Sequence, residues 1–404
     1  MSLRKNSCIT LILAILLIFV TNFKIGHAQT LSQPMIGTIT GINAGTERII
    51  EMLQEDETSK DEHKSAETEG DNPGITTESN EIEIFYPPSE PQINSNYSDK
   101  NQDIETFNET TTDKIEIEQI KNNCDLEKQQ IDKKINHTKI ITAVSGGVLK
   151  VDTDNGGEIK NKISGADIGF VRELKTSSGK LLVGGIVDYN HNSYDSDFKD
   201  VDGKGNSNAL TVGVIAKQSR HDGVYYEGSI RLGRAKTSLD ADNLQINRNK
   251  FDIHYEKSAP VYAGHAKLGK IIKLNEKETA DIYGIYAFSH QDHMNFELPD
   301  SENCRLSSID SNRLKVGCRM TTKVKNGKIY YGLSYQYEAK ASVKARHNDV
   351  EISSADGKGS SGVLELGYKL SAGKDNTVNV DLNASGFVGQ QKGFIFQAQL
   401  LKSI

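Results

Sequence analysis

The stretch KIYYGLSYQYEAKASVK, residues 328–344, decides the fold. From Ile329 to Val343 every odd position is apolar or aromatic, whereas the even positions are polar or small except at Tyr330. Alternation with a period of two places the two sets on opposite faces of one strand. The run exceeds the roughly five or six residues of an ordinary strand and the roughly nine to eleven that cross a bilayer. One apolar and one polar face suit a strand with lipid on one side and a wet lumen on the other.

The same alternation recurs from Ile140 to the C-terminus, and it divides this part of the chain into about twelve strands, an even number as in single-chain outer-membrane barrels. The connections alternate in length: residues 175–179 are a short turn, whereas 193–206 and 240–259 read as long hydrophilic loops. Because open sheet edges leave backbone groups unpaired in hydrocarbon, the strands must close. The sequence therefore predicts an all-β protein, a closed antiparallel transmembrane β-barrel over residues 139–404.

The N-terminus has the pattern of a secretory signal peptide over residues 1–28. Arg4 and Lys5 form its positive region, Ile9 to Val20 form its apolar region, and small residues precede cleavage after Ala28. An N-terminal membrane anchor is the alternative, but about twelve apolar residues are short for a spanning helix.

Two polar segments separate this signal from the barrel. Residues 29–112 are acidic and rich in Ser, Thr and Asn, so we expect a largely disordered passenger segment with one short amphipathic helix at Gly45 to Leu53. Residues 113–138 carry a thin apolar stripe without Gly or Pro between 113 and 136, which predicts a linker helix.

Composition excludes several functions. A net charge of −7 gives no support for nucleic-acid binding. We expect no metal site, because the histidines and cysteines lack ligand spacing, and no cofactor, because neither a phosphate loop nor a G-x-S-x-G elbow is present. Cys8 leaves with the signal, and Cys124, Cys304 and Cys318 remain.

The chain resembles the autotransporters of Gram-negative bacteria, the type V secretion family with a C-terminal outer-membrane translocator barrel. Four stretches carry the resemblance: GVYYEGSIRLGRAKTSL (223–239), YAGHAKLGK (262–270), IYYGLSYQYE (329–338) and ASGFVGQQKGFIFQAQLLKSI (384–404). The resemblance implies that the helix of residues 113–138 lies in the lumen and that the N-terminal segment is exposed at the cell surface. It also implies outer-membrane lipid, the barrel-assembly machinery and periplasmic chaperones as partners, besides an unknown surface ligand.

Family resemblance also implies a C-terminal assembly signal, which usually ends in an aromatic residue. Its members here share one parity and are Phe394, Phe396, Ala398, Leu400 and the non-aromatic Ile404.

Strand parity assigns the remaining candidate residues. We expect polar side chains in the lumen at Glu227, Arg231, Glu338, Glu365 and Asp381. We expect apolar side chains against lipid at Leu333, Tyr335, Leu366, Val380, Phe394 and Phe396. Glu338 is expected to join a salt-bridge network with lysines at 328, 340 and 344.

Chemistry is expected only at one weak candidate, the pair Asn122-Asn123, because some autotransporters cleave themselves between two asparagines in the lumen. Attack of the Asn122 amide on its own carbonyl carbon would form a succinimide, held by a lumenal carboxylate. A barrel protease or lipase lacks support, since no inward Ser–His pair or paired carboxylates are evident. The sequence predicts a non-enzymatic autotransporter barrel in the outer membrane that lets its own N-terminal segment reach the cell surface; the alternative is a small channel or porin-like barrel.

Overall fold

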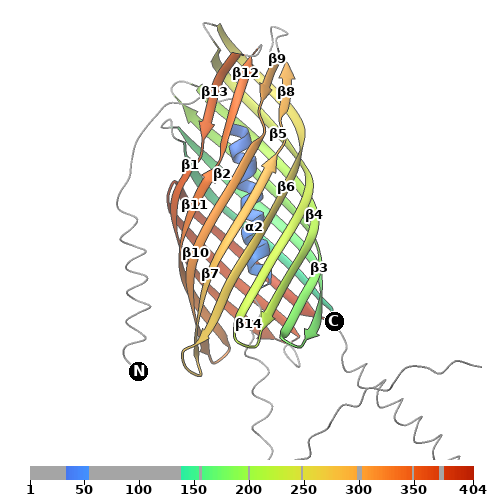
Figure 1. The fold of residues 1–404 in the computed structure, drawn as a ribbon. Coiled ribbons are helices and arrows are strands. Elements are labelled where there is room, and N and C mark those ends of the chain that lie inside the picture. Colours follow the sequence, from blue (N-terminus) through green and yellow to red (C-terminus); the bar gives the residue numbers. More distant parts are fainter. Residues whose placement is uncertain are drawn as a thin grey trace, which may run out of the picture. The chain divides into compact units, whose positions relative to one another are not determined.

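The computed structural model of the chain describes residues 33–53, 138–153, 157–198, 201–246, 249–297, 303–347, 350–372 and 377–404. Twelve antiparallel strands form a closed barrel around one helix, α2 (Gln33–Met52), as Figure 1 shows. The barrel strands, in chain order, are β1 (Thr138–Asp152), β2 (Glu158–Thr176), β3 (Gly179–Phe198), β4 (Val201–Arg220), β5 (Val224–Ile246), β6 (Asn249–Lys273), β7 (Glu278–Gln291), β10 (Ile309–Val324), β11 (Gly327–Lys340), β14 (Gly359–Ala372), β15 (Val378–Gly389) and β16 (Gln391–Ser403). Neighbours in this order pair with one another, and β1 pairs with β16 to close the ring. The predicted fold class is confirmed.

Strand β11 shows how the alternation maps onto the wall. Tyr331 and Tyr337 are exposed on the outer face, whereas Tyr330 is 1% exposed and points inward. Tyr330 breaks the polar parity because it lies on Gly367 of the adjacent strand β14, where a Cβ atom would be 2.1 Å from the ring. Glycine therefore makes the room that an aromatic side chain needs inside the barrel.

Two of the predicted long loops are wrong. Residues 193–198 and 201–206 continue β3 and β4, and most of 240–259 belongs to β5 and β6. The polarity of the faces inverts along these extensions: inward Leu239 and Tyr255 are buried and apolar, whereas outward Lys236 and Glu256 are exposed and paired at 2.7 Å. A charged outer face marks strand that has left the hydrocarbon, so these segments form a wall beyond the membrane.

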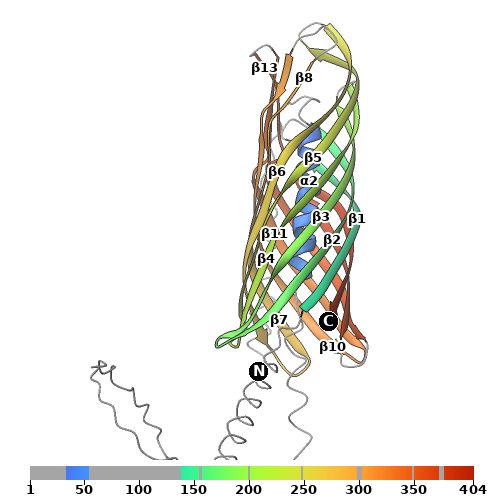
Figure 2. The same ribbon diagram turned by 90° about the vertical axis from the view of Figure 1, so that its right-hand side faces the viewer.

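A small second sheet lies at the same end of the barrel. Its strands are β8 (Met294–Glu297), β9 (Asn303–Leu306), β12 (Ser342–His347) and β13 (Val350–Asp356), paired in the order β13-β12-β9-β8. Figures 1 and 2 show it beside the upper ends of β5 and β6. The ring of Phe296 stacks on that of Tyr255 at 4.5 Å, which joins this sheet to the extended wall.

No helix among the described residues is both long and apolar enough to cross a membrane.

The outward face of β14 offers a test of the lipid-facing assignment. Leu366 is 58% exposed near the middle of its strand. Leu366→Arg should therefore lower the stability of the membrane-inserted barrel by about 2–4 kcal/mol and reduce the amount of folded barrel in outer-membrane fractions. His254→Arg puts the same side chain on the outer face of the β6 extension, where the histidine side chain is 74% exposed, and should assemble normally. Heat-modifiable migration on gels measures both variants, and equal amounts of folded protein would contradict the assignment.

Candidate functional site: the helix-filled lumen

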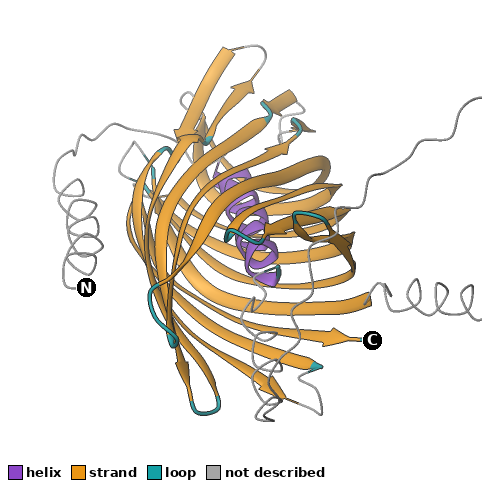
Figure 3. Ribbon diagram, turned by 60° about the horizontal axis from the view of Figure 1, so that its bottom comes forward, coloured by secondary structure: helices purple, strands orange, loops and turns teal. Residues whose placement is uncertain are grey.

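Helix α2 runs through the interior of the barrel, enclosed by the strands (Figure 3). It lies within residues 29–112, which we expected to be largely disordered and exposed apart from a short helix at Gly45 to Leu53. That helix is present, but it begins earlier, at Gln33, and lies inside the barrel, so the expectation of disorder and exposure is wrong for Gln33–Met52. The helix predicted at 113–138 falls outside the described residues, as does the pair Asn122-Asn123. The lumen of this barrel therefore holds a helix much nearer the N-terminus than the resemblance implied.

Three glycines set α2 against the wall. Gly37, Gly41 and Gly45 recur every fourth residue, so they lie on one face of the helix. A Cβ atom on Gly37 would lie 3.1 Å from the ring of Tyr194, and one on Gly45 would lie 2.6 Å from the side-chain amide of Asn190. Both wall residues belong to β3 and face the interior. The glycine face lets the helix backbone approach this strand more closely than any larger residue would allow.

Arg48 anchors the helix to the wall through side-chain contacts with three strands. Its Nε donates to Asp167 Oδ2 at 2.7 Å, and its Nη2 donates to Asp188 Oδ1 at 2.8 Å and to Asn190 Oδ1 at 2.9 Å. Its Nη1 donates to Ser145 Oγ at 2.8 Å. The side chain is 1% exposed, so the guanidinium is desolvated and its charge is matched by carboxylates in a fork geometry that arginine suits.

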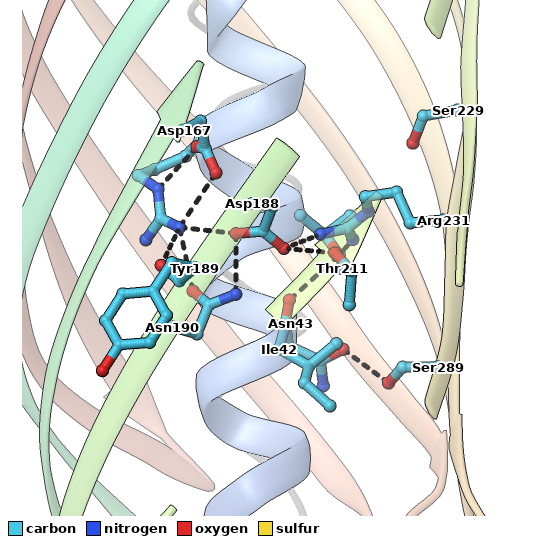
Figure 4. A network of polar contacts seen from close by, with 12 residues as sticks. Ile42, Asn43, Asp167, Asp188, Tyr189, Asn190, Thr211, Ser229, Arg231 and Ser289 are labelled. Carbon is cyan, nitrogen blue, oxygen red and sulfur yellow. Dashed lines mark hydrogen bonds and ion pairs between the residues drawn. The ribbon is translucent and has the colours of Figure 1, made fainter. Parts of the chain in front are cut away.

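Asp188 connects this anchor to a second arginine. Figure 4 shows its carboxylate between Asp167 and Asn190 on one side and Arg231 and Thr211 on the other. Arg231 pairs with Asp188 and also donates to the hydroxyl of Thr46 on the helix. Two arginines and two aspartates thus form one buried polar network across the helix–wall contact. Removing one member of such a network destabilises the fold, because the partner that stays behind is a buried, unpaired charge.

Two glutamates of α2 face basic residues on β10, which lies across the barrel from β2 and β3. Glu47 pairs with Lys315 at 2.8 Å and with Arg313 at 3.5 Å. Glu51 pairs with Arg319 at 2.8 Å, and Arg319 also pairs with Glu365 of the wall. Each of these helix charges therefore meets the opposite charge on the barrel, which indicates a binding surface made for this helix.

The wall also satisfies carbonyl groups at the C-terminal end of the helix. Lys217 Nζ donates to the carbonyl of Leu53 at 2.8 Å, and Gln399 Nε2 donates to that of Met52 at 3.0 Å. The last carbonyls of a helix lack partners within the helix, and a cation is favoured at this end of the dipole. The helix end is thus fixed at a defined height in the lumen.

The sequence-predicted site residues lie as follows. All five lumenal candidates point inward and are at most 8% exposed: Glu227, Arg231, Glu338, Glu365 and Asp381. Among the lipid-facing candidates, the outer face holds exposed Leu366, Phe394 and Phe396 and half-buried Leu333, Tyr335 and Val380. The outer face of β16 also carries the assembly-signal residues Ala398 and Leu400, and Ile404, 69% exposed, follows the strand.

Glu338 has other partners than those expected. It accepts hydrogen bonds from Ser311 Oγ at 2.7 Å and from the backbone N–H of Asn312 at 2.9 Å, and it lies 3.6 Å from Arg313. Strand pairing explains the difference, since Glu338 is opposite Arg313 on β10, whereas Lys328 pairs with Lys369 near the other end of the strand. The expected network of Glu338 with lysines at 328, 340 and 344 is therefore wrong, and its partners lie on the neighbouring strand β10 instead.

The structure brings together a serine, a histidine and a glutamate, contrary to our expectation that no inward Ser–His pair exists. Ser229 Oγ lies 2.8 Å from His265 Nδ1, and His265 Nε2 lies 3.1 Å from Glu227 Oε1. These residues are at most 5% exposed, so the serine hydroxyl is buried inside the helix-filled barrel. The trio therefore reads as a buried polar cluster in the wall, although these residue types serve nucleophilic catalysis elsewhere.

Sequence reasoning missed the residues that hold the helix, above all Arg48, Asp167 and Asp188. The spacing of Gly37, Gly41 and Gly45 was the available signal, because small residues at this interval mark close helix packing. Nothing local distinguished Asp167 or Asp188 from other polar residues on inward positions, since their partner lies more than a hundred residues away in the chain.

Comparison with known proteins agrees with this architecture. A family model described as the autotransporter beta-domain matches residues 141–385, more than half of the chain. The β domain of the Bordetella autotransporter BrkA matches with a TM-score of 0.53 and 15% identity, over 66% of this chain and 99% of that one. The transport unit of AIDA-I from Escherichia coli matches with a TM-score of 0.55 and 12% identity, over 66% and 90%. Comparison with curated proteins gave no match.

The closed barrel and its helix-filled lumen define an outer-membrane translocator-type barrel. The chain belongs to the autotransporter β-domain family, and its place is the outer membrane.

Proposed function

We propose that this barrel anchors in the outer membrane, lets its own N-terminal end reach the cell surface, and keeps α2 in the lumen as a fixed plug. The observation that carries the proposal is the match between α2 and the wall: Arg48, Glu47 and Glu51 each meet opposite charges there. A segment that only passed through the lumen would not need ion pairs matched to fixed positions on the wall. The barrel strands suit a membrane anchor, and α2 suits a segment of the same chain that stays in the lumen and blocks it.

Orientation follows from the connections. In outer-membrane barrels the short turns face the periplasm and the longer connections face outward. The short turns here lie at 177–178, 221–223 and 325–326, whereas the β8–β9 and β12–β13 hairpins occupy the other end. Met35 and Ile36, near the start of α2, belong to the same buried cluster as Phe296 and Cys304 of those hairpins. The N-terminal end of the helix thus points toward the cell surface.

Several finer points of this function rest on family resemblance. We propose that residues 1–28 are removed as a signal peptide, that periplasmic chaperones and the barrel-assembly machinery place the barrel in the membrane, and that a surface ligand meets the outer end. We also propose that the chain is not an enzyme; the burial of the trio at Ser229 supports this.

Single-channel conductance in planar bilayers tests the plug. Deletion of residues 33–52 should raise conductance several-fold, because the helix and its ion pairs fill the lumen of a barrel otherwise about as wide as a helix. Deletion of residues 113–136, a segment of similar length, should leave conductance at the wild-type level. Both variants should keep heat-modifiable migration, which controls for barrel folding.

The opposite pattern, with high conductance only after loss of 113–136, would overturn the assignment of α2 as the plug. High conductance of the wild-type protein would favour the channel alternative.

A further inference from the structure

The two chain ends that flank residues 54–137 lie at the same rim of the barrel. Leu53, the last described residue after α2, accepts a hydrogen bond from Lys217, which lies three residues before the end of β4 and next to the short turn at 221–223. Strand β1 begins at Thr138, whose carbonyl accepts from the backbone N–H of Ile404 at 2.9 Å. Thr138 pairs with Arg172, four residues before β2 ends at Thr176 and the short turn at 177–178 begins. The chain therefore leaves the lumen and enters the wall at the rim that carries the short turns.

An apolar cluster shows the same proximity from the side chains. Leu53 and Met52 from the end of the helix belong to one buried cluster with Ile141 of β1 and Leu401 of β16. No crossing of the barrel separates the end of α2 from the start of β1. The helix itself runs the other way, toward the hairpins at the far end.

We propose that residues 54–137 remain on the periplasmic side of the outer membrane, so that only the chain before Gln33 emerges at the surface. The inference rests on the proposed function for its orientation. A segment that begins and ends at the periplasmic rim has two routes outward, through the lumen or through the lipid. The first is filled by α2 with its ion pairs, and the second would bury polar backbone in hydrocarbon.

Composition makes this placement consequential. Residues 54–137 contain 22 of the 55 Asp and Glu residues of the chain and the cysteine Cys124. The acidic segment that a passenger reading assigns to the cell surface would instead face the periplasm. The longest segment outside the barrel would then face the periplasm rather than the cell surface.

Thiol labelling in cells tests the placement with the chain's own cysteine. A membrane-impermeant maleimide is added to intact cells and to cells with a permeabilised outer membrane, and labelled sites are mapped by mass spectrometry. Cys124 should react only after permeabilisation, and Ser98→Cys, a second reporter in the same segment, should behave alike. Cys304 and Cys318 are at most 5% exposed and should stay unlabelled until the protein is denatured.

His254→Cys supplies the matched control, because this position is exposed on the β6 extension. It should react in intact cells. Labelling of Cys124 or Ser98→Cys in intact cells, beside a reactive His254→Cys, would overturn the inference while leaving the proposed function in place. Failure of His254→Cys to react in intact cells would instead contradict the orientation on which the proposed function depends.

Discussion

Replacing Arg48 with methionine is expected to release α2 from the lumen and to open the barrel to ions. The substitution keeps an unbranched side chain but removes the charge that neutralises Asp167 and contributes to Asp188. Breaking one side of a buried ion pair typically costs about 3–5 kcal/mol, because the carboxylate left behind stays desolvated. The measurements are single-channel conductance and protease cleavage within residues 33–52 of the purified barrel.

A paired substitution separates the loss of charge balance from the loss of packing. Arg48→Met combined with Asp167→Asn leaves no unpaired aspartate at that position, while Asp188 keeps Arg231 as its partner. The double variant should recover a substantial part of the lost stability, which a double-mutant cycle measures. Arg305→Met, at an exposed position on β9, is the control and should behave as wild type. An Arg48→Met protein that conducts and resists protease as the wild type does would show that this network does not hold the helix.

Two alanine substitutions in α2 are expected to differ in their effect on the docking of the helix. Gly45→Ala places a Cβ atom 2.6 Å from Asn190 and 2.9 Å from Asp188, and neither side chain can move without breaking its contact with Arg48. We expect this overpacking to destabilise helix docking by about 1–3 kcal/mol.

Gly41→Ala is the matched control, because its Cβ atom would lie 3.4 Å from that of Asn192. Higher helix propensity should make this variant neutral or more stable by up to about 1 kcal/mol. Protease cleavage of α2 as a function of urea concentration gives the docking free energy of both. Equal shifts for the two variants would contradict the close approach of α2 to β3.

The sequence predicted the barrel well because each strand carries its own signal. The alternation within residues 328–340 depends only on having lipid on one face, and Tyr330, whose ring lies inward on Gly367, is its one exception. The prediction of a single lipid-facing strand over residues 328–344 is wrong at its end, because β11 stops at Lys340 and Val343 is buried in the second sheet. The extensions of β5 and β6 were missed because inward Leu239 and Tyr255 and outward Lys236 reverse the expected polarity. A prediction that requires the apolar residues of a strand to stay on its outer face assigns such a segment to a loop.

Only the second half of helix α2 was predicted from local pattern, as the amphipathic helix at Gly45 to Leu53; the first half, from Gln33, was not. Gly37, Gly41 and Gly45 each disfavour a helix by roughly 1 kcal/mol relative to alanine, and the surrounding composition is polar. The helix forms because the barrel wall supplies its packing and its hydrogen bonds, which is tertiary stabilisation that no local pattern carries. The contact between Ser229, His265 and Glu227 was not predicted for a related reason, since the register of β5 against β6 decides which side chains meet.

The most direct test of a lumen filled by the N-terminal helix is a disulfide between that helix and the wall. Thr38 Oγ1 of α2 lies 3.1 Å from Thr237 Oγ1 of β5, so Thr38→Cys with Thr237→Cys should oxidise to a cross-link in the folded barrel. Mass spectrometry after proteolysis should find a peptide from residues 33–52 joined to one from β5, whereas Thr38→Cys with Thr211→Cys should give none. Absence of the first cross-link in a barrel that migrates as folded would show that α2 does not occupy the lumen.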